Sequence, residues 1–160
     1  MKVELNDGPT TTRGYGSPIW LYGLTAFVSL FGLADAIYLA IEHITGQSVR
    51  CTIIAGCSEV LSSPYAVVAG VPLAMIGAAA YFSVFSLATL AVFGYRIAGT
   101  LLAILVGAML MVSLWLIYLQ AFVIHAFCQF CLISAAITFI LAVCVGIATL
   151  RSRHLPTSVQ

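Results

Sequence analysis

Charged side chains are scarce in this chain. Of its 160 residues only 7% are Asp, Glu, Lys or Arg, whereas 62% are apolar, and the mean hydropathy is +1.14. A soluble domain with this much apolar surface would aggregate in water. The composition therefore excludes an ordinary soluble domain and predicts an integral membrane protein.

Basic clusters are missing as well. The six Lys and Arg residues are scattered along the chain, and the formal net charge is only +1. Nucleic-acid binding depends on basic patches that neutralise phosphates. We therefore expect lipid around the chain and no nucleic acid as a partner.

Long apolar stretches are what the chain has instead. Each is nearly free of charge, lacks the alternation of a barrel strand and can cross a hydrocarbon core about 30 Å thick. The four stretches run from Ile19 to Ile44, Val71 to Phe93, Ile97 to Ile124 and Cys128 to Leu150. The first is longer than the core of a secretory signal and no small-residue cleavage site follows it, so we expect it to be retained. The sequence predicts an all-α integral membrane protein with one bundle of four transmembrane helices.

The regions outside these stretches predict the domain organisation. Residues 1–18 are polar and rich in Gly, Pro and Thr, which is typical of a disordered tail. We expect a four-helix membrane domain over 19–150 and a second tail over 151–160. Between the first two spans, the segment from Cys57 to Ser63 is amphipathic and ends at Pro64, which predicts a short interfacial helix in the loop. Pro72 suits the first turn of a helix, so we expect the second span to start there.

The few basic residues lie almost entirely on one side of the predicted bundle. That side carries Lys2, Arg13, Arg96, Arg151 and Arg153, whereas the opposite side carries only Arg50. By the positive-inside rule both termini are cytoplasmic in the cell (inner) membrane. The loop over 45–70 and the turn at His125 then face outward, where disulfides persist.

Four of the five cysteines form two pairs on this outer side. Cys51 and Cys57 lie in the loop, and Cys128 and Cys131 form a Cys-x-x-Cys motif at the start of the fourth span. Free backbone N–H groups and the positive end of the helix dipole stabilise a thiolate there and lower its pKa. Cys144 lies too deep in the span to exchange with them. The four outer cysteines predict a membrane thiol relay.

Two other uses of these cysteines remain open. They could be two inert disulfides that staple a structural or partner-binding four-span protein without catalysis, or four thiolate ligands of zinc. The staple is less favoured because the bilayer already holds a four-span bundle. The zinc site is less favoured because only His125 and Glu59 accompany the cysteines, and we expect no bound metal.

The order of the motifs resembles the vitamin K epoxide reductase family, specifically its bacterial members. The matching residues are Cys51-x5-Cys57-Ser-Glu-Val-Leu-Ser62-Ser63-Pro64-Tyr65, Gly70-Val-Pro72-Leu and Cys128-x2-Cys131, within residues 19–150. The resemblance implies a four-helix bundle around a quinone, with the Cys-x-x-Cys motif beside the quinone ring. It also implies that Cys51 and Cys57 are the loop shuttle pair, and that Ser63 contacts the quinone.

The resemblance and the residues together predict a quinone-dependent membrane thiol oxidoreductase. Electrons would pass from a separate thioredoxin-fold oxidase, similar to DsbA, through Cys51 and Cys57 to Cys128 and Cys131. The acceptor would be a membrane quinone of the ubiquinone, menaquinone or phylloquinone type. Asp35, the one acidic residue deep in a span, is a candidate proton donor to the reduced quinone.

The chain also departs from the animal members of that family. Ala135 stands where animal members carry a tyrosine four residues after the Cys-x-x-Cys motif, and their second-helix asparagine is not evident. Both departures argue against epoxide reduction.

Overall fold

The computed structural model describes residues 19–45 and 56–154. Its four long helices are α1 (Ile19–Thr45), α3 (Leu73–Val92), α4 (Arg96–Leu119) and α5 (Gln129–His154). Each belongs to a segment long and apolar enough to cross a membrane. The predicted all-α, four-span architecture is confirmed, and the protein is a multi-pass membrane protein. The predicted tail over 1–18 lies outside the described residues, as do loop residues 46–55 and the chain end from 155 onward.

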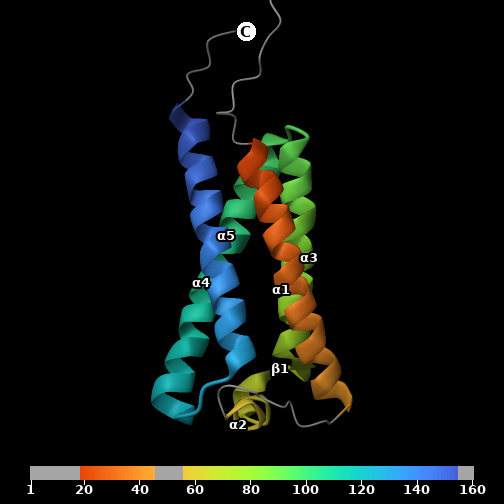
Figure 1. Ribbon diagram of the computed structural model, residues 1–160, viewed down its shortest axis with the longest axis vertical. Coiled ribbons are helices and arrows are strands. Elements are labelled where there is room, and N and C mark those ends of the chain that lie inside the picture. Colours follow the sequence, from red (N-terminus) through yellow and green to blue (C-terminus); the bar gives the residue numbers. More distant parts are fainter. Residues whose placement is uncertain (1–18, 46–55, 155–160) are drawn as a thin grey trace, which may run out of the picture.

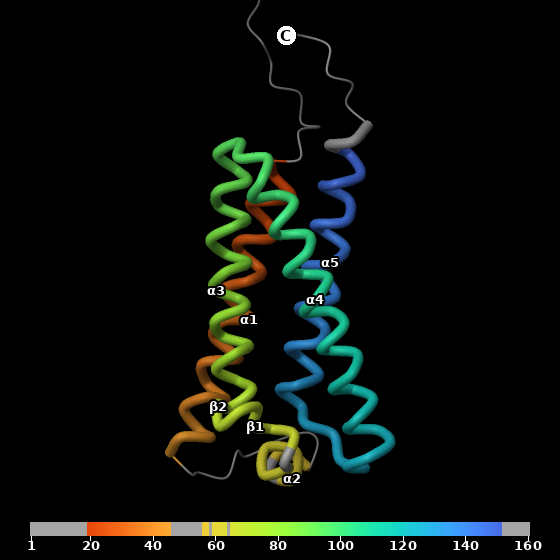
Figure 2. Tube along the Cα trace, turned by 180° about the vertical axis from the view of Figure 1, so that it is seen from behind, coloured from red at the N-terminus to blue at the C-terminus, as the bar shows by residue number. Residues whose placement is uncertain are grey.

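The four spans form a closed ring (Figures 1 and 2). α1 packs along α3 and α5, and α4 packs along the same two helices from the other side. The start of α1, the α3–α4 turn and the end of α5 lie at one end of the bundle, which we call the terminal end. The segment from Gly56 to Pro72 and the turn before α5 lie at the other, which we call the cysteine end. Arg96 and Arg151 therefore lie at the terminal end.

Short elements cover the cysteine end. α2 (Cys57–Leu61) lies crosswise to the spans, as both views show, and confirms the predicted short helix in the loop. A 3-10 turn, η1 (Pro64–Ala66), follows it, and then β1 (Val67–Val68) pairs antiparallel with β2 (Val71–Pro72). α3 begins one residue after Pro72, close to the predicted start.

The sequence predicted the end of the third span at Ile124 but not this hairpin or the π-helical turn with which that span ends. Ala69 and Gly70 have φ angles of 51° and 83°, and positive φ at both central residues is what a two-residue type I′ hairpin turn requires. α4 ends at Leu119 and passes into a π-helical turn, η2 (Gln120–Ile124), and His125 then adopts a left-handed φ of 53°. Hydropathy alone does not distinguish these conformations from ordinary helix.

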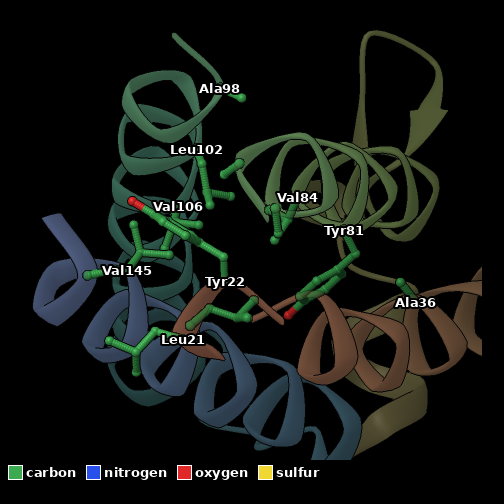
Figure 3. Close-up of a cluster of buried hydrophobic side chains, with 13 residues drawn as sticks. Leu21, Tyr22, Ala36, Tyr81, Val84, Ala98, Leu102, Val106 and Val145 are labelled. Carbon is green, nitrogen blue, oxygen red and sulfur yellow. The ribbon is translucent and has the colours of Figure 1, made fainter. Parts of the chain in front are cut away.

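Buried side chains form two clusters of unequal size. The larger cluster draws on all four spans and lies mostly towards the terminal end (Figure 3). Many of its members are alanines, which lets neighbouring helix backbones approach closely. The smaller cluster lies at the cysteine end and consists of Leu39, Cys57, Val60, Ala126 and Cys128. Large apolar side chains elsewhere point outward, as lipid contact requires.

Tyr81, a member of the larger cluster, connects three spans. Gly32 of α1 has no side chain, and a Cβ atom there would collide with the Tyr81 ring. The Tyr81 hydroxyl donates to the Ser134 carbonyl oxygen at 2.9 Å and lies 2.8 Å from Ser134 Oγ and 2.9 Å from Thr138 Oγ1. A polar group buried in a membrane span is therefore fully hydrogen-bonded.

Candidate functional site

The start of α2 packs directly on the turn that precedes α5. Gly56 has a φ of 141°, and a Cβ atom at this residue would lie 2.9 Å from the Phe127 carbonyl oxygen and 3.3 Å from Ala126 Cβ. A residue with a side chain would thus be both strained and obstructed. The glycine lets the next residue, Cys57, approach the turn that carries Cys128.

Cys57 and Cys128 share one small apolar cluster. Their exposed fractions are 1% and 0%, and Leu39 and Val60 pack in the same cluster. Cys57 is disulfide-bonded, whereas Cys128 and Cys131 are free thiols. Cys51 lies outside the described residues. The fold therefore brings the second loop cysteine close to the first cysteine of the Cys-x-x-Cys motif.

Both the backbone N–H and the backbone carbonyl oxygen of Cys128 form hydrogen bonds. Its N–H donates to Oε1 of Gln120 at 2.9 Å, and its carbonyl oxygen accepts the Leu132 N–H at 3.1 Å as α5 begins. The first turn of α5 therefore places the free N–H groups of Phe130 and Cys131 near the Cys128 sulfur. This is the helix N-terminus that the sequence predicted for the motif.

The environment of Cys128 favours its thiolate. A hydrogen bond from the Cys131 thiol lowers the pKa of Cys128 to about 7, and the backbone N–H groups of Cys131 and Phe130 act in the same direction. Burial opposes the shift but is weaker. The lowered pKa agrees with the sequence-based expectation for a thiol at this position.

A cavity of about 300 Å³ lies between the two clusters. All four spans and the segment after α2 line it, and most of its wall is apolar. Its polar side chains are Asp35, His43, Ser63, Tyr65, Tyr81, Ser113, Gln120, Cys131, Ser134 and Thr138. Cys131 packs against the smaller cluster and lines this cavity, whereas Cys128 is buried within that cluster together with Cys57. The two thiols of the motif therefore have different surroundings.

The other two predicted site residues also line this cavity. The Oδ2 atom of Asp35 is the one buried side-chain oxygen or nitrogen in the described part of the chain that has no hydrogen-bond partner. The hydroxyl of Ser63 donates to the Val60 carbonyl oxygen at 2.7 Å, so its hydrogen is already used. Glu59 is exposed on α2, and Cys144 is buried in α5 outside the cavity.

Sequence reasoning missed Gln120 and the hydroxyl cluster around Tyr81. Gln120 is 2% exposed, lines the cavity and bonds the Cys128 backbone. The sequence did contain an indication, because Gln120 is the one amide side chain in a predominantly apolar span. Tyr81 lies 53 residues before Ser134 and 57 before Thr138 in the sequence, and only the folded structure, which brings α3 to α5 at this point, reveals the cluster.

The structure weakens both alternative uses of the cysteines. Cys128 and Cys131 are free thiols, so they do not form the second inert disulfide that a stapled protein would contain. Cys57 is disulfide-bonded, and a disulfide sulfur is not the thiolate that a four-cysteine zinc site needs.

Comparison with known proteins identifies the family. No curated protein matches the chain. The model of the Vitamin K epoxide reductase family matches residues 23–145, which extend from α1 into α5 and make up most of the chain. Members of this family are thiol:quinone oxidoreductases. The chain therefore belongs to the vitamin K epoxide reductase family and is a multi-pass membrane thiol:quinone oxidoreductase.

Proposed function

We propose that the protein reoxidises a separate thioredoxin-fold oxidase, similar to DsbA, and passes its electrons through two cysteine pairs to a membrane quinone. The route runs through Cys51 and Cys57 and then through Cys128 and Cys131. The observation that supports this proposal most directly is that the two thiols of the Cys-x-x-Cys motif have different neighbours. Cys128 is buried in the same cluster as Cys57, whereas Cys131 packs against that cluster and also lines the cavity.

Thiol exchange accounts for the first half of the route. A thiolate of the reduced partner attacks Cys51 of the loop disulfide, and Cys57 leaves as a thiolate. The partner's second thiol displaces Cys51, which leaves the partner oxidised and the loop pair reduced. Cys57 then attacks Cys128 of an oxidised motif, and Cys131 leaves. Cys51 resolves this mixed disulfide, so the loop disulfide is restored and both thiols of the motif are reduced.

The cavity suits a quinone as the final acceptor. Its wall is mostly apolar, as a ring with a hydrocarbon tail requires, and Cys131 supplies a thiol at the wall. A bound quinone takes two electrons and two protons, and the motif returns to the disulfide. Asp35 is placed in the wall with a buried, unpartnered oxygen, which supports its role as the proton donor. Ser63 would contact the ring as an acceptor, or as a donor after releasing Val60. The quinone would be of the ubiquinone, menaquinone or phylloquinone type.

The proposed orientation places both termini in the cytoplasm and both cysteine pairs outside. Arg96 and Arg151 lie at the terminal end, and the cysteine end has no Lys or Arg among its described residues. This distribution supports the positive-inside assignment. An extracytoplasmic partner could then reach the loop.

Quinone reduction by the purified protein in detergent tests the route. With a reduced partner as donor, Cys51→Ala and Cys131→Ala should each abolish quinone reduction. With dithiothreitol, a small thiol that bypasses the partner, Cys51→Ala should retain most activity and Cys131→Ala none. Cys144→Ala is the matched control and should behave as the wild type with both donors. Equal loss in Cys51→Ala and Cys131→Ala with dithiothreitol would contradict the order of the pairs.

A further inference from the structure

Gln120 connects the backbone of Cys128 with the cavity. Its side chain starts from the π-helical turn at the end of α4 and lines the cavity that also holds Cys131. π-Helical turns inserted into helices are often found at functional sites. The route described above uses no group of this residue.

The hydrogen bond at Cys128 fixes the orientation of the Gln120 amide. A backbone N–H can only donate, so the atom that faces Cys128 must be the carbonyl oxygen Oε1, 2.9 Å away. The NH2 group then occupies the other branch of the amide. A flipped amide would set two donors against each other.

The NH2 group of Gln120 donates no hydrogen bond to any residue in the described ranges 19–45 and 56–154. The residue is 2% exposed and lines the cavity, and its nitrogen is not among the fully buried atoms that lack a partner. The NH2 group therefore borders the open space of the cavity, where it can donate to a group that enters. The cavity beside it is where an acceptor can bind.

We propose that Gln120 binds the quinone, donating a hydrogen bond from its NH2 group to a carbonyl oxygen of the ring while its Oε1 holds the Cys128 N–H. This inference rests on the proposed position of the quinone in the cavity. A quinone carbonyl is an acceptor without a proton of its own, so it matches an amide donor. The same side chain thereby fixes the ring relative to the first turn of α5, which carries both thiols.

The substitution Gln120→Met separates this role from a general effect on folding. Methionine has a similar length but can neither donate nor accept these hydrogen bonds. With dithiothreitol as donor, KM for the quinone should rise about 3- to 10-fold, the range expected for one neutral hydrogen bond. Thr100→Val is the control, because it removes an exposed polar group from the same helix outside the cavity. Its KM should equal that of the wild type.

The substitution Gln120→Glu tests the donor itself and serves if Gln120→Met does not fold. A carboxyl group accepts the Cys128 N–H in either protonation state, but only its protonated form donates to a quinone oxygen. The ratio of the variant's KM to the wild-type KM should therefore rise with pH. The wild-type KM, measured over the same pH range, corrects for the other titratable groups that face the cavity or adjoin Gln120; these are Asp35, His43, Tyr65, Tyr81, Cys128 and Cys131.

Three outcomes decide the proposal. A raised KM in Gln120→Met together with a pH-dependent ratio in Gln120→Glu supports it. An unchanged quinone KM in Gln120→Met, even with a lower kcat, would overturn it, because Gln120 would then only hold Cys128. A ratio independent of pH would overturn it too. Failure of the wild type itself to reduce quinone would instead refute the proposed function.

Discussion

At the scale of single residues, the two thiols of the Cys-x-x-Cys motif differ although only two residues separate them. Cys128 is fully buried beside Cys57 and its pKa is lowered, whereas Cys131 borders the cavity. A nucleophile in thiol exchange must be a thiolate, and its partner sulfur must be reachable. The surroundings thus assign each thiol a different neighbour in the proposed route.

Removing the Cys131 thiol should raise the pKa of Cys128. The hydrogen bond from Cys131 is the largest cause that lowers this pKa from 9.0 to about 7. A thiol is ionised above its pKa, so at pH 7 the thiolate fraction should fall from about one half to a few per cent or less in Cys131→Ala. Thiolate absorbance of the reduced protein, titrated against Cys128→Ala, measures this. Cys131→Ser keeps a hydroxyl donor and should shift less, and an identical titration of the Cys131→Ala variant and the wild type would contradict the assignment.

Asp35→Asn should slow quinone reduction without preventing thiol exchange. The amide keeps the size of the carboxyl but cannot release a proton, so turnover with dithiothreitol should fall about 10-fold or more. The rate at which a reduced partner reduces the loop disulfide should be unchanged, because Asp35 borders the cavity rather than the cluster around Cys57. Stopped-flow measurements of the two half-reactions distinguish these effects. Equal slowing of both would indicate a structural role.

At the scale of secondary-structure elements, hydropathy predicted the four spans, and the amphipathic segment before Pro64 predicted the short helix in the loop. Hydropathy could not predict the π-helical turn at Gln120 or the hairpin at Gly70, because both depend on local backbone geometry inside or beside apolar segments. The candidate site, too, was only partly predictable from the sequence. Cysteine spacing, the intramembrane Asp35 and the resemblance that gave Ser63 selected residues that fall in or near the cavity, except Cys51, which lies outside the described residues. The partners of Tyr81 on α5 lie more than 50 residues away in the sequence, so only the folded structure reveals them.

Gly56→Ala should impair transfer between the two cysteine pairs. The added methyl group would press on the Phe127 carbonyl oxygen and move α2 away from the turn that carries Cys128. We expect partner-driven quinone reduction to fall about 10-fold or more, since small displacements of reacting groups have large effects on rate. Activity with dithiothreitol should remain near the wild-type level.

Gly70→Ala is the control for backbone strain in this comparison. Gly70 also has a positive φ, of 83°, but a Cβ atom there would meet nothing within 4 Å. It should lower stability by about 1 kcal/mol without changing the ratio of partner-driven to dithiothreitol-driven activity. If Gly56→Ala and Gly70→Ala lowered the ratio of partner-driven to dithiothreitol-driven activity equally, backbone strain rather than the contact with Phe127 would be responsible for the loss.

At the scale of the whole molecule, the orientation in the membrane decides which compartment supplies the electrons. A membrane-impermeant thiol reagent, added to intact cells after mild reduction, should label Cys51 and Cys57. Cys128 should react more slowly because it is fully buried, and Cys144 should react only after solubilisation. Mass spectrometry of the labelled peptides provides the readout. Labelling of the loop pair only in permeabilised cells would reverse the orientation and exclude an extracytoplasmic partner.

The unequal clusters of buried side chains also bear on how the protein moves. The larger cluster holds the spans together towards the terminal end, whereas five residues close the cysteine end. Local opening starts where the fewest apolar contacts must be broken. The segment from Gly56 to Pro72 can therefore separate from the bundle while the larger cluster stays intact. The cavity can then exchange its contents with the lipid. Fluctuation and stability reside at opposite ends of the same four helices, so the reaction cycle can proceed without approaching global unfolding.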